Sequence, residues 1–474
     1  MKTTTFTSFA AAALLAATST TAIAQDMTAA PTNTGNIVNM RDAIETAIMA
    51  NPEILQAQYN TEAIQMEREQ AQSLYLPRLD LEASAGARRL ENNTRRSLGI
   101  ADDWLYPLEA SATADWTLID FGRRRGELLR QAARVDGASL RVVERSEFIA
   151  LAVARQYLDV LLQQRIVAAS QDNLAFHNTL VGDLTRGVEQ ESISVADLQQ
   201  AEERLMSARV REAEAIESLE SAQHALRRLT GLTINTVTLP PDLSAALPST
   251  EDETLGLART RNPLVREAQA DVDAAHGLVM AAKGDFYPTV GAEVRGRIGE
   301  DIDGFKGETN DVQARVYLRW TVFDGGLRRG KYQEMVHRSS QARYRLHEVT
   351  RQAEEDASNA WTALRAQQSI GAALTRQSEV SDDLLLSYRS QFNVGRRSLL
   401  DVLDAQNTRF NTQVRLETSR FSQLFAQYQI LAATNRLLEA MDLEPGAGAG
   451  KEERARFDFG PSKEAETDYR RYPH

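Results

Sequence analysis

Two carboxylates lie three residues apart in a long segment that contains no proline. They are Asp401 and Asp404, and residues three apart on a helix share roughly one face. Rings of such carboxylates, contributed by several copies of a chain, are a known means of selecting cations in a pore. The alternatives are an ordinary solvated helix face and an acid that complements the positive end of a helix dipole. The residues alone leave these interpretations open.

The sequence contains none of the common enzyme motifs. The 6 histidines are scattered, and neither an H-E-x-x-H pair, a G-x-S-x-G elbow nor a Walker loop occurs. The glycine-rich run at 446–450 is not framed by strand and helix, as a phosphate loop must be. The absence of cysteine excludes disulfides and thiolate metal sites. We therefore predict no enzyme, no metal site and no cofactor.

The chain begins like an exported protein. An Ala-rich apolar stretch follows Lys2, and Ala22 and Ala24 fit an A-x-A cleavage site. The stretch is shorter than the roughly 20 residues that a spanning helix needs. We predict a signal peptide at 1–24 and an N-terminal extension at 25–39. A mean hydropathy of −0.39 excludes a bundle of apolar membrane helices, but not a barrel of alternating strands.

Arginine clusters at Arg123–Arg125 and Arg328–Arg329 raise the possibility of nucleic-acid binding. A net charge of −12 and the export signal oppose it. Both clusters directly follow predicted strands, so we expect them at the junction of strands and helices.

One large repeat organises the chain. The segment 116–122, WTLIDFG, returns 204 residues later at 320–326 as WTVFDGG. Upstream, Asn51-Pro52 matches Asn262-Pro263 at an offset of 211. Two constant offsets on either side of one length change indicate duplication of a unit of about 205 residues.

Each copy contains two runs in which apolar and polar residues alternate. This period of two predicts β-strands with one apolar face, at about 78–90, 106–119, 289–299 and 311–323. Each run has about the ten residues that a tilted strand needs to cross a bilayer. A soluble hairpin would alternate as well, but the unit offers no partner sheet. Four strands cannot close a membrane barrel, and open edges are not tolerated in lipid. If the strands span a membrane, several chains must therefore share one barrel.

The other segments of each copy are rich in good helix formers. No proline occurs between Pro107 and Pro240, and a helix from Arg123 to about Arg186 would be about 95 Å long. In the next helix, near 192–228, small residues recur every seven positions: Ala201, Ala208, Ala215 and Ala222. That spacing favours antiparallel coiled-coil pairs over an amphipathic helix on a globular core. Shorter first helices are expected at about 40–74 and 251–285.

The fold class is therefore mainly α with β, built from a duplicated unit of helix, β-hairpin, very long helix and second helix. The first structural repeat is predicted at 40–232 and the second at 251–442. A proline-containing linker, 233–250, joins them, and a flexible tail is predicted at 443–474.

This organisation resembles the TolC family of outer-membrane exit ducts. The most specific match is 392–406, FNVGRRSLLDVLDAQ, which looks like the family's helix-turn-helix at the periplasmic end of the second copy. The resemblance implies a homotrimer whose hairpins form one 12-stranded transmembrane β-barrel and whose helices continue as an α-barrel through the periplasm. It also implies three kinds of partner: outer-membrane lipid, a periplasmic adaptor (membrane fusion) protein, and an inner-membrane ABC or other export transporter.

The same resemblance assigns roles to residues at the periplasmic end. Asp401 and Asp404 match the pore-constricting aspartates and would form two stacked rings in a trimer. Arg397 matches the arginine that latches the entrance shut, and Asp197 matches its partner carboxylate in the first copy. Phe392 falls where relatives can carry a tyrosine, and it lacks the hydroxyl for that hydrogen bond. The adaptor is expected to contact two turns, through Gly187, Val188, Ser192, Asn393, Val394, Gly395, Arg396 and Ser398.

The predicted function is a passive exit duct of a tripartite export system in the outer membrane of a Gram-negative cell, most similar to those of type I protein secretion. Residues 400–406 look somewhat more like the secretion branch of the family. One alternative is a small-molecule or drug efflux duct of the same family. Another, from a different class, is a pore-less periplasmic coiled-coil adaptor or scaffold, which would need no lipid-facing alternation.

Overall fold

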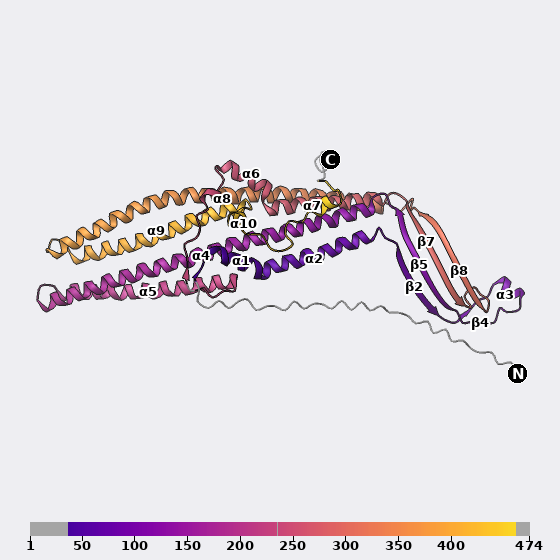
Figure 1. Ribbon diagram of the computed structural model, residues 1–474, viewed down its shortest axis with the longest axis horizontal. Coiled ribbons are helices and arrows are strands. Elements are labelled where there is room, and N and C mark those ends of the chain that lie inside the picture. Colours follow the sequence, from indigo (N-terminus) through magenta and orange to yellow (C-terminus); the bar gives the residue numbers. More distant parts are fainter. Residues whose placement is uncertain (1–36, 235, 461–474) are drawn as a thin grey trace, which may run out of the picture.

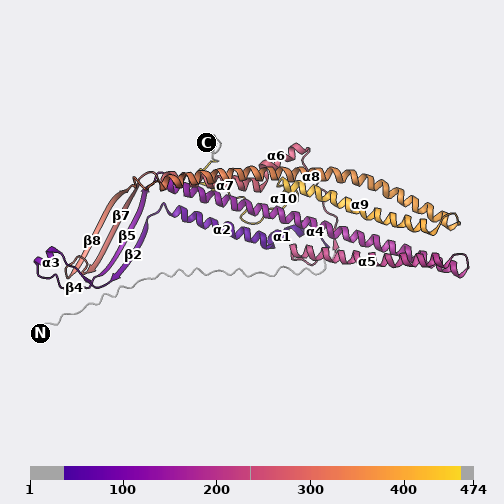
Figure 2. The same ribbon diagram turned by 180° about the vertical axis from the view of Figure 1, so that it is seen from behind.

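The computed structural model describes residues 37–460 with the exception of residue 235 (Figure 1). The predicted signal peptide, nearly all of the N-terminal extension and the end of the tail lie outside the described residues. The molecule is elongated, with a β-sheet at one end and two long helical hairpins at the other, as both side views show (Figures 1 and 2).

Two helices of equal length run along the body. They are α4 (Arg123–Glu189) and α8 (Leu327–Asn393), each of 67 residues. Each begins after a glycine with positive φ, 97° at Gly122 and 95° at Gly326, a conformation that residues with a Cβ rarely adopt. None of the helices described is both long and apolar enough to cross a membrane.

Both long helices turn back into a shorter partner, α5 (Val195–Thr230) and α9 (Leu399–Ala433). The small residues of the predicted seam of α5 are all buried: Ala201, Ala208, Ala215 and Ala222. The corresponding positions of α9 are buried too: Ala405, Thr412, Ser419 and Ala426. Small side chains let the two helices of each hairpin approach closely, which confirms the predicted coiled-coil pairs.

The first helix of each repeat is broken into two. Instead of the predicted single helices at 40–74 and 251–285, the structure has α1 (Met40–Ala50) and α2 (Pro52–Ser73), then α6 (Glu251–Arg261) and α7 (Pro263–Gly284). The break lies at an Asn-Pro pair in both repeats. The residue before proline is disfavoured in the helical region, and each Asn side chain accepts a hydrogen bond of 2.9 Å from the first turn of the next helix.

Four strands form one antiparallel sheet in the order β2-β5-β7-β8. They are β2 (Arg78–Ala85), β5 (Leu108–Ile119), β7 (Thr289–Glu300) and β8 (Glu308–Arg319). β5 pairs with β7 in a register that places Ala112 opposite Gly296, so the two repeats meet in the middle of the sheet. β2 and β8 form its two edges.

The two faces of this sheet differ in chemistry, as the alternation predicted. One face exposes large apolar side chains: Leu79, Leu81, Val294, Ile298, Val312 and Val316. The other carries charged pairs, including Arg315 with Glu293 at 2.9 Å and Arg295 with Glu109 at 3.3 Å. Among the residues that the structure describes, no other element covers the apolar side chains, which are 49–82 % exposed.

The segment between β2 and β5 is built from short elements. It contains β3 (Arg88–Arg89), α3 (Asn93–Ser97) and β4 (Trp104–Leu105). Arg95 is 1 % exposed. Its guanidinium donates to the carbonyl oxygens of Ile100 and Asp103 at 2.6 and 3.0 Å, and to that of Gly304 in the β7–β8 loop.

The linker between the repeats is packed into the main core. β1 (Ile37–Val38) pairs in parallel with β6 (Thr236–Val237), and the short helix η1 (Ser244–Ala246) follows. The Tyr157 hydroxyl of α4 lies 2.9 Å from the carbonyl oxygens of Val38 and Thr238. The linker thereby joins the start of the first repeat to the middle of α4.

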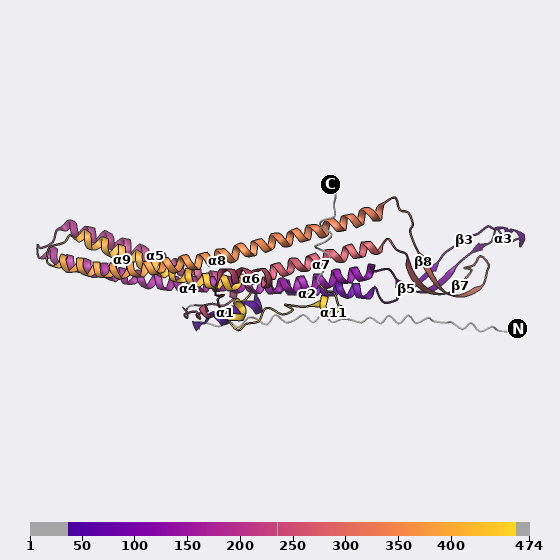
Figure 3. The same ribbon diagram turned by 90° about the horizontal axis from the view of Figure 1, so that it is seen from above.

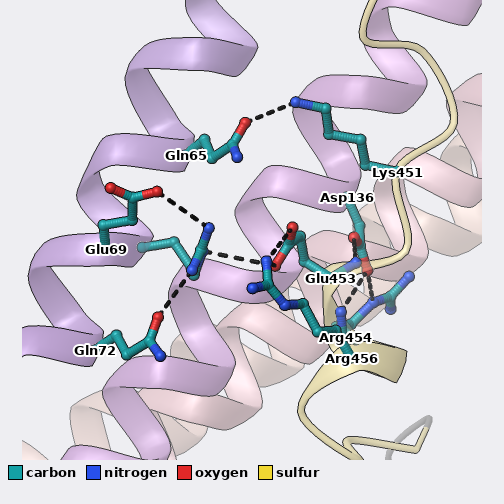
Figure 4. Close-up of polar contacts among 9 residues, drawn as sticks. Gln65, Glu69, Gln72, Asp136, Lys451, Glu453, Arg454 and Arg456 are labelled. Carbon is teal, nitrogen blue, oxygen red and sulfur yellow. Dashed lines mark hydrogen bonds and ion pairs between the residues drawn. The ribbon is translucent and has the colours of Figure 1, made fainter. Parts of the chain in front are cut away.

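The prediction of a flexible tail is wrong for residues 443–460. After α10 (Leu437–Ala440), residues 445–460, here called the C-terminal strap, lie along α2, α4 and α7 and include α11 (Glu453–Arg456) (Figure 4). Arg454 lies 2.6 Å from Asp136 of α4 and also pairs with Asp273 of α7. Both aspartates are at most 3 % exposed. Buried charges need partners, and the charged residues of the strap supply them.

Candidate functional site

The turn between α4 and α5 is compact. α4 ends at Glu189, and the backbone N–H of Ser192 donates to the Gly187 carbonyl at 2.9 Å. Gly187 is buried, and a Cβ there would lie 2.5 Å from Cγ1 of Ile193, so only glycine fits without displacement. Val188 is half-buried on the last turn of α4.

The turn between α8 and α9 lies at the same end of the molecule, as two perpendicular views agree (Figures 1 and 3). Gly395 has a φ of 73° and donates its N–H to the Phe392 carbonyl at 2.9 Å. The side chains predicted to contact an adaptor here are exposed: Asn393, Val394, Arg396 and Ser398. The structure thus brings the two predicted contact turns to the same end of the molecule.

A serine and an aspartate cap the second helix of each hairpin in the same way. The Ser398 hydroxyl accepts from the Asp401 N–H at 3.2 Å and lies 2.7 Å from the Asp401 carboxylate. Ser194 and Asp197 repeat this geometry at 3.1 and 2.7 Å. Both aspartates therefore lie in the first turn of a helix, where a negative charge is favourable. Asp401 has this local role in a single chain, whatever it does in an assembly.

Arg397 makes its contacts within its own hairpin. Its Nε lies 3.8 Å from the Asp401 carboxylate, and its guanidinium lies 4.0 Å from the ring centre of Tyr388 in α8. The residues described contain no ion pair between Arg397 and Asp197 within one chain. Asp404, one turn further along α9, is exposed. The latch and the two carboxylate rings stay predictions about several copies of the chain.

Phe392 packs where the two hairpins meet. It lies against a cluster formed by Leu180 and Leu184 of α4 with Leu399 and Leu403 of α9. The ring of Phe392 therefore provides apolar contact between the first and second repeats of one chain, instead of the hydrogen bond that a tyrosine could make.

Polar contacts between the hairpins were not predicted from the sequence. The Gln406 amide donates to Asn173 of α4 at 2.8 Å, with both side chains buried, and Arg211 of α5 donates to Asn407 at 2.9 Å. His177 is buried close by, and burial, followed by the charges of Arg211 and Arg204, lowers its pKa. The sequence offered one sign of these contacts: Asn173, His177 and Gln406 lie on helix faces that also carry apolar residues.

The residues that the structure describes contain no cluster of candidate metal ligands. Within 37–460, leaving residue 235 aside, no three His, Cys, Asp or Glu side chains gather closely enough to hold an ion.

The fold and tip geometry define a class of protein. A duplicated unit with one shared sheet and two long helical hairpins matches the model of the outer membrane efflux protein family over residues 43–232 and 254–441. The chain belongs to this family, which confirms the predicted TolC-type architecture of α-barrel and β-barrel. It is an outer membrane protein whose helical part lies in the periplasm.

Individual relatives are distant. The outer membrane efflux protein BepC of Brucella suis is 25 % identical over 59 % of this chain and 62 % of its own length. TolC of Escherichia coli is 22 % identical over 85 % of this chain and 83 % of its own. The alkaline protease secretion protein AprF of Pseudomonas aeruginosa is 25 % identical over 52 % and 53 %. The chain thus spans less than two thirds of the length of BepC and of AprF.

A solved structure shares the fold. The Campylobacter jejuni CmeC outer membrane channel superposes with a TM-score of 0.74 at 13 % identity, covering 91 % of this chain and 90 % of that one.

Proposed function

We propose that three copies of this chain form a passive exit duct through the outer membrane. One observation supports this most strongly: the four-stranded sheet has two unpaired edges, β2 and β8, and an exposed apolar face. Unpaired backbone groups are not tolerated in lipid, so the edges must be closed by other copies. Three sheets of four strands would make a barrel of twelve, within the range of known membrane barrels.

The helices would continue this barrel as a tunnel through the periplasm. α2, α4, α7 and α8 all begin or end at the sheet, so a closed barrel places twelve helices in a ring beneath it. The tips of α4–α5 and α8–α9 would form the entrance. There Asp401 and Asp404 would make two stacked carboxylate rings, and Arg397 with Asp197 of another hairpin would hold the entrance closed.

An adaptor and an inner-membrane transporter would open this entrance by binding the two turns. A partly exposed Arg–Asp pair is worth only about 0–1 kcal/mol, so modest differential binding suffices to shift the closed state. The chain would conduct cargo and catalyse no reaction.

For the cargo we propose protein substrates of a type I secretion system. Support comes from residues 400–406, and AprF, a relative, is named as a secretion protein. Efflux of small molecules is the alternative, because BepC is named as an efflux protein. A pore-less adaptor is disfavoured, because it has no use for an exposed apolar sheet face.

Conductance in planar lipid bilayers tests the duct. The purified protein should form cation-selective channels that trivalent cations block from the periplasmic side. The double variant D401A/D404A should weaken this block at least tenfold, whereas E202A, on an exposed position of α5, should not. A protein that inserts but never conducts would exclude the duct, and unchanged block would exclude the rings alone.

A further inference from the structure

Two tryptophans mark the end of the exposed apolar face that lies nearest the helices. Trp116 of β5 lies opposite Ala292 of β7, which in turn lies opposite Val316 of β8, so its side chain belongs to the apolar face. Trp320 directly follows β8 and repeats the position of Trp116 in the second repeat. Both rings are exposed, and each indole N–H donates to a backbone carbonyl just before β2 or β7, at 2.9 and 3.2 Å. Tryptophans at the ends of lipid-facing strands lie at the depth of the lipid headgroups.

The helices that follow the sheet have two distinct sides. A hollow of about 440 Å³ lies on one of them, and its lining includes Thr117 of β5, Arg123 of α4 and Ala282 of α7. Side chains alternate along a strand, so Thr117, the neighbour of Trp116, belongs to the polar face of the sheet. The hollow therefore lies on the polar side of the junction between sheet and helices.

The C-terminal strap lies on the opposite side of these helices. Its Arg454 pairs with Asp273 of α7, and Asp273 precedes Ala282 by nine residues, which is about two and a half helical turns. One side of α7 thus contacts the strap, and the opposite side faces the hollow. The strap accordingly lies on the apolar side, the side of the two tryptophans.

Arg125 points toward the strap. It follows Arg123 by two residues, a rotation of about 200° around α4, and its guanidinium lies 5.4 Å from the ring centre of Phe459. Arg125 is exposed, and it makes no hydrogen bond or ion pair with any residue that the structure describes. Arg124 beside it is buried and pairs with Asp120 at 2.8 Å. Arg125 is therefore an unpaired cation on the apolar side.

The second repeat places an arginine at the same position. Arg329 of α8 corresponds to Arg125 at the repeat offset of 204 residues. It is exposed and has no ion pair within the described part of the chain, whereas Arg328 pairs with Asp324 at 2.6 Å. Lys331, which lines the hollow, follows Arg329 by two residues, so Arg329 also points to the apolar side.

Anionic phospholipids fit this arrangement. A guanidinium group binds phosphate through two parallel hydrogen bonds, and the long arginine side chain can extend along apolar surface to reach the headgroups. Inorganic phosphate offers the same charge, but it lacks the acyl chains that the adjoining apolar face would contact. The continuity of the two arginines with that face therefore favours a lipid over the free anion.

We propose that Arg125 and Arg329 each bind the phosphate group of an anionic phospholipid in the periplasmic leaflet of the outer membrane, next to Trp116 and Trp320. The inference rests on the orientation of the apolar face toward lipid, which is part of the duct proposed above. It does not rest on the conduction of cargo.

Quenching of tryptophan fluorescence by lipids with brominated acyl chains tests the proposal. The full-length protein carries W104F/W320F/W361F, which leaves Trp116 as its only tryptophan, and is reconstituted in phosphatidylcholine vesicles that contain phosphatidylglycerol. Bromination of one lipid or the other measures the preference for phosphatidylglycerol near Trp116. An arginine near an anionic surface contributes about 1 kcal/mol, so this preference should be about fivefold.

R125Q should abolish the preference at Trp116. R123Q is the matched control, because Arg123 is exposed in the same helical turn but lines the hollow on the polar side. That variant should keep the full preference. Thermal unfolding midpoints of both variants should stay within a few degrees of the parent, which separates lost binding from lost folding.

The same measurement on Trp320, with the other three tryptophans replaced by phenylalanine, tests the second site. There R329Q should abolish the preference, and R125Q should leave it unchanged.

Three results would overturn the proposal: no preference for phosphatidylglycerol in the parent, an equal loss in R123Q and R125Q, or a greater loss in sodium phosphate than in sodium chloride of equal ionic strength. The last result would indicate a site for the free anion. Conductance of the same preparations in planar bilayers keeps this proposal apart from the duct. Channels that conduct without any lipid preference would leave the duct intact and exclude only the lipid sites.

Discussion

At the scale of residues, Asp401 and Asp404 differ in what they do within one chain. Asp401 belongs to the cap of α9 with Ser398, whereas Asp404 is exposed one turn further on. The two interpretations of Asp401, helix cap and pore carboxylate, are therefore compatible. They can be separated because only one of the two aspartates contributes to the cap.

We expect S398A to loosen the first turn of α9 by about 1 kcal/mol, the usual cost of losing an N-cap. D404A should leave that turn intact. Hydrogen exchange of the backbone amides of residues 399–402 measures this directly. If D404A increased exchange as much as S398A, the assignment of the cap would be wrong.

Arg454 contacts two buried carboxylates from different repeats, Asp136 and Asp273. Removing one partner of a buried pair costs about 3–5 kcal/mol, whereas replacing all partners with neutral groups is often tolerated. R454A should therefore lower the thermal unfolding midpoint by several degrees. D136N/D273N/R454M should recover most of the loss.

The loss in R454A should depend on pH. Burial already raises the pKa of Asp136, with Arg454 opposing that rise. A raised carboxyl pKa means that the folded state disfavours the charged form, so stability falls as pH rises through that pKa. Without Arg454 the deficit should be larger at pH 7 than near pH 4, where an unfolded aspartate is half protonated. A deficit that grew toward low pH would contradict this assignment.

At the scale of elements, the C-terminal strap joins three helices. Besides the Arg454 contacts, Lys451 donates to Gln65 of α2 at 2.7 Å, and the Gly446 N–H donates to Ser146 of α4 at 3.0 Å. Figure 4 shows the strap lying across these helices. We infer that the strap fixes the spacing of α2, α4 and α7.

A chain ending at Glu444 should therefore show faster hydrogen exchange in α2 and α7 than a chain ending at Gly460, which keeps every described contact of the strap. The two hairpins at the entrance, distant from the strap, should exchange equally in both. Equal exchange in α2 and α7 would mean that the strap contributes nothing to their packing.

Arg95 likewise holds two loop segments together at the far end of the sheet, the segment between β2 and β5 and the loop between β7 and β8. Because its guanidinium bonds carbonyl oxygens of both the β2–β5 segment and the β7–β8 loop, R95A should release both segments together. Limited proteolysis of intact cells should then cleave near residues 91–103 and 301–307. R96A provides the matched control, since Arg96 is exposed and pairs only locally, with Glu91.

At the scale of the whole molecule, the sheet edges predict how copies associate. The chain has no cysteine, so any disulfide that forms must join cysteines introduced by mutation. S84C in β2 combined with a series of single cysteines along β8 should give disulfide-linked dimers and trimers. S111C/R297C should give only an intrachain bond, because these residues are direct partners in β5 and β7. Absence of intermolecular bonds at every β8 position would contradict a shared barrel.

Several features of the fold were predictable because they rest on local periodicity. The alternation of β5 and β8 and the Ala seam of α5 each repeat a short spacing that one helix or strand must satisfy. The break at Asn51-Pro52 also has a local signal, because the residue before a proline disfavours the helical region. The good helix formers on both sides nevertheless favoured the prediction of one continuous helix, which is wrong. The helix α3 was missed because it is only five residues long and is held by Arg95, whose partners are distant in sequence.

Residue spacing along the chain is enough to predict the duplication, the strands, the long helices and the family. Two other features are visible only in the folded molecule: Arg454 lies between Asp136 and Asp273, and the tail up to residue 460 forms the C-terminal strap. These features depend on which side chains meet when helices far apart in sequence pack together. Burial and charge pairing between distant segments stabilise these features, and neither can be read from one stretch of sequence.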